Sequence, residues 1–139
     1  MKRIFFALIV SSAIGCNQQK GGIKKGTFQI IENDSVVGKI YRYGSYQIEL
    51  YPNGKEVAAS INYLSDSTYV LSGLEKQKDL IDSITWLNIY KEKGKDSFMV
   101  MATPSNINTN YQYEGLLVKI DDEVNETYLK KLDSLNENM

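Results

Sequence analysis

The sequence contains no histidine, a single cysteine and only two prolines. Without histidine there can be no imidazole base, no nucleophile activated by histidine and no zinc site built on histidine. A single cysteine also excludes an intramolecular disulfide framework. We therefore expect a protein that is not an enzyme and that has no metal or cofactor.

Neither sign of charge dominates, since 16 Lys and Arg face 17 Asp and Glu in 139 residues. Apolar residues make up 42% of the chain and charged residues 24%. This balance is typical of a chain that folds around a core rather than of a disordered one. The length allows one folded domain at most.

No apolar run is long enough to cross a bilayer as a helix, which takes about 20 residues. The longest N-terminal run, residues 4–10, follows Lys2 and Arg3 and precedes the small residues 11–15. This three-part layout is typical of a secretory signal peptide. We therefore predict that residues 1–15 are a signal peptide.

The segment Ala13-Ile14-Gly15-Cys16 resembles the lipobox of bacterial lipoproteins. The resemblance implies that Cys16 is lipidated and anchors the protein to a lipid bilayer, most simply in the outer membrane because Asn17 is not the Asp of inner-membrane retention. Ala13 departs from the larger apolar residue usual at the first position, so cleavage by ordinary signal peptidase is the alternative. That route gives a secreted protein with a free thiol.

Cleavage before Cys16 removes Lys2 and Arg3, so 14 of the 16 basic residues remain against 17 acidic ones. The resulting balance of −3 disfavours nucleic acid as a partner. Residues 16–26 are polar and rich in glycine, which predicts a flexible tether. We expect residues 27–139 to form a single β domain.

Alternating apolar and polar residues predict strands through most of this domain. The expected strands span residues 27–33, 36–43, 46–51, 55–64, 68–74, 84–92, 97–103 and 111–120. Their short connections predict an antiparallel meander, either a small calycin-like barrel or a strongly curved sheet. Residues 75–83 are a longer connection, with a helical turn expected near 79–82.

The segment Tyr51-Pro52-Asn53-Gly54-Lys55 predicts a three-residue hairpin loop in which Gly54 adopts a positive φ. Near the end of the chain, Val124, Tyr128, Leu132 and Leu135 recur at helical spacing. This recurrence predicts a C-terminal helix over 122–136, with the acidic residues 121–123 at its start.

We expect the barrel interior to be filled by side chains, because eight strands leave a narrow interior. The more apolar face of each strand gives the inward set: Phe28, Ile48, Leu50, Ala59, Ile61, Leu71, Val100 and Val118. Arg42 and Glu49 are expected to pair across the second hairpin. Ten Tyr and Trp86 suggest either core and cross-strand packing or a cavity that stacks a ligand.

The domain also resembles small uncharacterised lipoproteins of Bacteroidota bacteria. The shared landmarks, over most of residues 26–120, are Gly26-Thr27-Phe28, Arg42 to Glu49, Ala59 to Tyr63, Thr68-Tyr69-Val70 and Asp96-Ser97-Phe98. The resemblance implies an envelope protein and provides no catalytic residues.

Asp-Ser occurs five times, and four of the pairs are followed by Val, Thr, Ile or Leu. Such triplets resemble the O-glycosylation sequon of Bacteroidota periplasmic proteins. The candidate sites are Ser35, Ser67, Ser83 and Ser134. The alternative is that Asp and Ser bond the local backbone at turns and strand starts.

Two functions remain open. The first is a structural or protein-interaction lipoprotein with an envelope protein as partner, which would expose an apolar patch around a filled core. The second is a calycin-like binder of a small apolar ligand, which would contain an interior cavity. The sequence favours the first, because the interior is expected to be filled.

Overall fold

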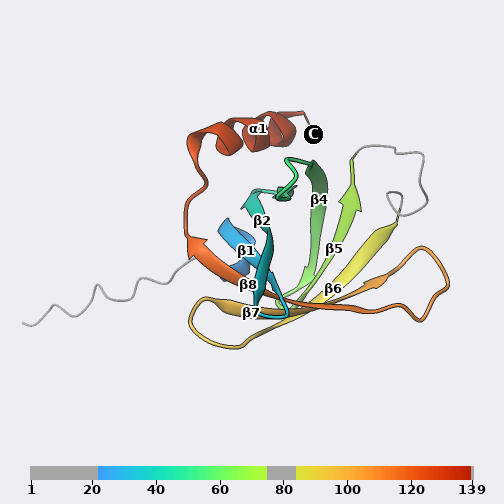
Figure 1. Cartoon of the computed structure of the whole chain (residues 1–139). Helices are drawn as coiled ribbons and strands as arrows, with labels where there is room; N and C mark the ends of the chain where they lie inside the picture. The colour runs from blue at the N-terminus through green and yellow to red at the C-terminus, as the bar shows by residue number, and fades with distance from the viewer. Residues whose placement is uncertain (1–21, 75–83, 139) are drawn as a thin grey trace, which may run out of the picture.

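The computed structural model describes residues 22–74 and 84–138. Eight strands form a closed antiparallel barrel in chain order, with β1 paired to both β2 and β8 (Figure 1). The strands are β1 (Gly26–Glu32), β2 (Ser35–Tyr43), β3 (Tyr46–Leu50), β4 (Glu56–Ser65), β5 (Thr68–Gly73), β6 (Thr85–Glu92), β7 (Ser97–Pro104) and β8 (Tyr113–Asp121). The predicted meander is confirmed, and of its two forms the chain adopts the closed barrel.

The hairpin between β3 and β4 has the predicted geometry. Gly54 lies at φ 88°, and its amide donates to the Tyr51 carbonyl at 2.9 Å. The Tyr51 amide in turn donates to the Lys55 carbonyl at 3.0 Å, while Asn53 Oδ1 accepts from the Lys55 amide at 2.9 Å. The loop thus satisfies its own backbone through the residue types that predicted it.

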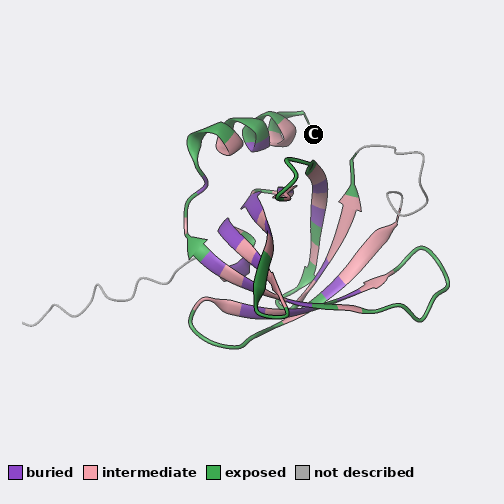
Figure 2. Cartoon of the chain, in the orientation of Figure 1, coloured by how far each residue is buried: buried purple, intermediate pink, exposed green. Residues whose placement is uncertain are grey.

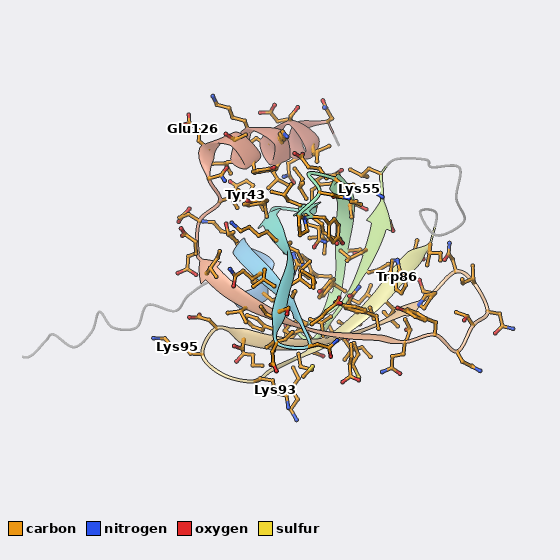
Figure 3. All side chains as sticks on the ribbon, in the orientation of Figure 1. Tyr43, Lys55, Trp86, Lys93, Lys95 and Glu126 are labelled. Atoms are coloured by element: carbon orange, nitrogen blue, oxygen red, sulfur yellow. The ribbon has the colours of Figure 1, made fainter. Side chains whose placement is uncertain are left out.

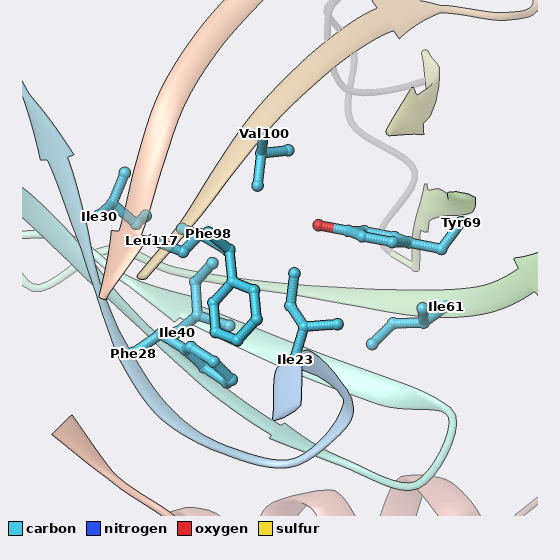
Figure 4. Close-up of a cluster of buried hydrophobic side chains, with 9 residues drawn as sticks. All are labelled: Ile23, Phe28, Ile30, Ile40, Ile61, Tyr69, Phe98, Val100 and Leu117. Atoms are coloured by element: carbon cyan, nitrogen blue, oxygen red, sulfur yellow. The ribbon is translucent and has the colours of Figure 1, made fainter. Parts of the chain in front are cut away.

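The barrel starts earlier in the chain than predicted. Residues Gly22–Lys24 form a short 3-10 helix, η2, and the Ile23 side chain is only 2% exposed. Ile23 lies among the inward side chains of the apolar core in Figure 4. Residues 22–26 therefore belong to the folded barrel rather than to the tether, because Ile23 closes one end of the interior.

The C-terminal helix α1 (Glu126–Glu137) begins four residues later than the predicted 122. Asn125 Oδ1 accepts from the Tyr128 amide at 3.0 Å and caps the helix. Asp121 Oδ1 accepts from the Glu123 amide at 2.9 Å, which holds residues 121–123 in a turn before the helix. The acidic segment is therefore a connection and not the first helical turn.

The helix lies across the outer face of β2 and β3. Its buried and half-buried residues face the barrel and its exposed ones face away (Figure 2). A second buried cluster lies between α1 and the barrel. It consists of Tyr41, Ile48, Val124 and the helix residue Leu132, with Leu50 packed against it. The domain therefore has two apolar layers, one inside the barrel and one between the barrel and α1.

This second layer changes the predicted inward set. Phe28, Ile61 and Val100 lie in the interior core, with Leu71 packed against it, and Ala59 is buried as well. Ile48 and Leu50 instead face α1. Val118 faces outward, because Leu117 beside it lies in the interior core and neighbouring residues of a strand point to opposite faces. The inward assignment of Ile48, Leu50 and Val118 was wrong.

Candidate functional site: a cavity with polar groups inside the barrel

The barrel encloses a cavity of about 280 Å³ toward the end where β1 and β3 finish and β8 begins. The expectation of a filled interior was therefore wrong. Part of the space arises because Ala102 and Gly115 line the cavity with little or no side chain. A further part arises because β3 turns its polar face, Gln47 and Glu49, inward.

The apolar part of the lining comes from strands all round the barrel. It includes Ile30, Val37, Ile40, Leu71, Val100 and Leu117. Of these residues, Ile30, Ile40, Val100 and Leu117 also belong to the core cluster drawn in Figure 4. The cavity is thus continuous with the core on one side, and Ile23 closes the barrel beyond it.

At the bottom of the cavity, the Arg42 side chain is fully buried. Its Nε donates to Gln47 Oε1 at 3.0 Å, its Nη2 donates to the same oxygen, and its Nη1 donates to the Ile23 carbonyl at 2.9 Å. The guanidinium carbon also lies 5.5 Å from the Phe28 ring centroid and 5.0 Å from that of Tyr69. These contacts hold the cation in place, and no carboxylate among the described residues is bound to it directly.

The predicted Arg42–Glu49 pair was wrong in its register. Arg42 lies opposite Gln47 in the ladder, and Glu49 lies opposite Ile40. Gln47 connects the two charges, since its Nε2 donates to Glu49 Oε2 at 3.1 Å. The hydroxyl of Tyr51 donates to the other oxygen of Glu49. A continuous hydrogen-bonded chain therefore runs from the buried Arg42 outward to Tyr51.

A second carboxylate faces the same space. Glu32 Oε2 accepts from the Tyr113 hydroxyl at 2.5 Å. The Tyr113 ring lies against its own strand over Gly115, where an added Cβ would come 2.5 Å from the hydroxyl. Glycine at 115 is therefore required for Tyr113 to reach Glu32.

The two tyrosines share one electrostatic environment. Burial, followed by the charge of Glu49, raises the pKa of Tyr51 well above its ordinary value. Burial, followed by the hydrogen bond to Glu32, does the same for the pKa of Tyr113. All four side chains line the same cavity, and the charges of both Glu32 and Glu49 help to raise the pKa of each tyrosine. Their hydroxyls stay protonated and donate to the carboxylates.

Aromatic side chains line the outer part of the cavity. The Trp86 and Tyr111 rings meet edge to face with centroids 5.9 Å apart, and Tyr111 is 54% exposed. Asn88, next inward on β6, donates to the Trp86 carbonyl at 3.0 Å. Figure 3 shows Trp86 at one end of β6, with Lys93 and Lys95 in the turn beyond its other end. Exposure increases from Arg42 to Tyr111, so the cavity opens at the Trp86 end.

The aromatic residues thus divide between the two predicted roles. Tyr69, Trp86, Tyr111 and Tyr113 line the cavity. Tyr41 instead stacks on Tyr128 beneath α1, with ring centroids 4.0 Å apart. Sequence reasoning included the tyrosines and Trp86 as candidates for a cavity but missed Glu32, Gln47 and Asn88. The available signal was that Gln47 and Glu49 share one face of β3 with no basic partner on it.

The predicted modification sites are widely separated. Ser35 at the start of β2, Ser67 in the β4–β5 turn and Ser134 on α1 are all exposed. Asp34, before Ser35, has a φ of 64°, which fits the turn role of Asp-Ser pairs. Cys16 and Ser83 lie outside the described residues, as do residues 79–82. Of the predicted modification sites that the structure describes, Ser35, Ser67 and Ser134, none lines the cavity.

Within the two described ranges, no three Cys, Asp or Glu side chains are grouped so that they could hold a metal ion. No helix among the same residues is long and apolar enough to cross a membrane. The arrangement offers non-covalent recognition, with an apolar wall, two carboxylates, an amide and tyrosine hydroxyls directed into one space. Neither the family models, nor the curated proteins, nor the solved structures include a match to this chain.

Proposed function

We propose that this protein is a lipid-anchored envelope protein whose calycin-like barrel binds a small amphipathic molecule. The observation that supports it best is the cavity of about 280 Å³ with polar groups converging on an otherwise apolar lining. Ligand sites typically combine these two features, whereas a purely structural barrel gains stability by filling its interior. The cavity therefore favours a binder over the structural module that the sequence favoured.

The size and lining of the cavity limit the ligand. A cavity of about 150 Å³ holds benzene, so 280 Å³ has room for one ring and a short chain. A wholly apolar ligand would take water from the remaining acceptor positions of Glu32 and Glu49 without replacing it, at a cost in desolvation. The ligand should therefore combine an apolar body with at least one polar group.

Native mass spectrometry of protein purified from its own membrane tests this binding. The variant Ala102→Phe places a ring into the cavity from β7, and Met101→Phe places the same ring on the outer face, where Met101 is 37% exposed. We expect a small molecule bound to the natural protein and to Met101→Phe, but not to Ala102→Phe. An empty natural protein, or equal occupancy in all three, would refute the binding function.

The membrane anchor depends on Cys16. A Cys16→Ser variant should lack attached lipid and leave the membrane fraction, because three acyl chains would each contribute about 0.8 kcal/mol per buried CH2. Mass spectrometry of the intact protein gives the readout, with Ser12→Ala as the control inside the same segment. Equal lipid mass on Cys16→Ser would contradict the anchor, and an unlipidated natural protein would favour secretion with a free thiol.

A protein-interaction function is supported by one separate observation. Ile89 and Met101 are paired across β6 and β7 on the outer face and are 47% and 37% exposed. Apolar neighbours of this kind favour contact with an envelope protein. Cross-linking in the native envelope tests this candidate, since Ile89→Glu with Met101→Glu should abolish a specific adduct while cavity occupancy is retained.

A further inference from the structure

The cavity is lined by more carboxylates than cations, and the two signs differ in how far the protein already binds them. Among the described residues that line the cavity, Arg42, Glu32 and Glu49 are the ones with a formal charge at neutral pH, and together they give this described lining a balance of −1. Of the ion pairs between described residues, none includes Glu32 or Glu49. The space therefore carries a net negative charge that no described cation neutralises through direct contact.

The cation in the lining, Arg42, is already bound by groups of the protein. All three guanidinium nitrogens of Arg42 donate to protein acceptors, Gln47 Oε1 and the Ile23 carbonyl. Phe28 and Tyr69 also lie within cation–π distance. The hydrogen bonds use three of the five guanidinium N–H groups, so an anionic ligand would have at most the other two, at the fully buried end of the cavity, and would also have to approach Glu49. The cavity therefore offers an anion little to bind.

The carboxylates, by contrast, retain acceptor capacity. A carboxylate has about four lone-pair positions, and Glu32 uses one of them for Tyr113 whereas Glu49 uses two, for Tyr51 and Gln47. The tyrosine hydroxyls point at these oxygens and orient them. An N–H donor entering the space thus meets acceptors that are already fixed in position.

We infer that the ligand is a small organic cation, with an ammonium group bound between Glu32 and Glu49 and an apolar body against the wall of Leu71, Val100 and Trp86. This inference rests on the proposed binding function. Three features favour a positive charge on the ligand. A cation would neutralise the lining, its N–H groups would donate to the two carboxylates, and the aromatic rings near the entrance attract cations.

Three probes of matched shape test the sign of the charge: 2-phenylethylamine, 2-phenylethanol and 3-phenylpropionate. Trp86 is the only tryptophan in the chain and lines the cavity, so its fluorescence reports occupancy directly. We expect the amine to bind at least about tenfold more tightly than the alcohol, and the carboxylate to bind most weakly. The preference for the amine should decrease as salt is raised.

Two variants test the assigned residues. Glu32→Gln and Glu49→Gln should each reduce affinity for the amine by about tenfold or more and leave affinity for the alcohol within about twofold. The control is Glu114→Gln, whose carboxylate lies next to Tyr113 in the sequence but is exposed on the outer face. Retained alcohol binding shows that each variant is still folded.

The outcomes separate this inference from the binding function. A preference for the alcohol or the carboxylate, or an amine preference that survives both Glu substitutions, overturns the inference and leaves the binding function intact. If no probe binds, the charge of the molecule found by native mass spectrometry decides: a cation supports the inference, and a neutral or anionic molecule overturns it. If no probe binds and no molecule is found, both fail.

Discussion

Arg42 and Gln47 face each other across β2 and β3, and Gln47 Oε1 accepts from both Nε and Nη2 of the guanidinium. Both side chains are fully buried. One amide oxygen thus takes two of the three donor nitrogens of a buried cation, while the amide nitrogen donates to Glu49. Gln47 therefore allows the barrel to contain a positive charge and a carboxylate without direct contact between them.

The first prediction removes this amide. Gln47→Leu leaves two donor nitrogens of the buried Arg42 without acceptors, so the free energy of unfolding should fall by about 3 kcal/mol. Denaturant titration provides the measurement. The control is Gln29→Leu, on the outer face of β1, which should change the free energy of unfolding by no more than about 0.5 kcal/mol. If Gln47→Leu were as stable as the natural protein, Arg42 would not depend on Gln47.

The sequence was sufficient to predict the strands because alternating apolar and polar residues mark them and polar turns or loops separate them. Every predicted strand lies within two residues of its observed bounds. Alternation shows that a strand has an apolar face, but it does not show what covers that face. On β3 the apolar face is covered by α1, which is distant in the sequence, so Ile48 and Leu50 were assigned to the wrong side.

The same limit explains the missed cavity. On β8 the inward face contains Gly115 and Lys119, which look like surface residues, and the outward face contains Val118. Lys119 is nonetheless 6% exposed, with its Nζ 2.9 Å from Asp122 Oδ1 and 5.6 Å from the Phe28 ring centroid. Long-range partners such as these decide the burial of a charged residue, and hydropathy patterns do not contain them.

The second prediction concerns the attachment of α1 to the barrel. Leu132 is fully buried beneath the helix, so Leu132→Ala should destabilise the protein by about 2 to 5 kcal/mol through lost burial and a residual cavity. Lys130→Ala, whose side chain is 77% exposed, should have an effect below about 1 kcal/mol. Thermal unfolding of both variants tests this. Equal stability would show that the helix is not required by the barrel.

The third prediction concerns the β3–β4 hairpin. Gly54 and Gly94 both have open space where a Cβ would lie, but only Gly54 has a positive φ, 88°. Gly54→Ala should therefore cost about 1 kcal/mol or more, because L-residues are strained in this conformation. Gly94→Ala should be neutral or slightly stabilising, because alanine restricts the unfolded chain. Chemical denaturation of both variants measures the cost of placing alanine at a positive φ. Equal losses of stability in the two variants would contradict this prediction.

The last prediction concerns alkaline pH and follows from Tyr51 and Tyr113. Burial and the neighbouring carboxylates Glu49 and Glu32 raise the pKa of both hydroxyls above the ordinary value of 10.0. Below pH 10 both tyrosines are protonated in the folded and unfolded states, and their stabilising effect is fully present. Above pH 10 the unfolded chain releases protons that the folded barrel retains, so stability must fall as pH rises.

The expected slope is at most about 1.4 kcal/mol per pH unit for each tyrosine, and it is smaller here because solvent screens these half-buried side chains. Tyr113→Phe removes one of the tyrosines whose pKa is raised and should make the fall above pH 10 shallower, with no change of slope between pH 7 and 9. Urea titrations at fixed ionic strength from pH 7 to 11 provide the measurement. An unchanged slope above pH 10 would mean that Tyr113 loses its proton as readily in the barrel as in the unfolded chain. In that case the hydrogen bond from Tyr113 to Glu32 would not persist in solution.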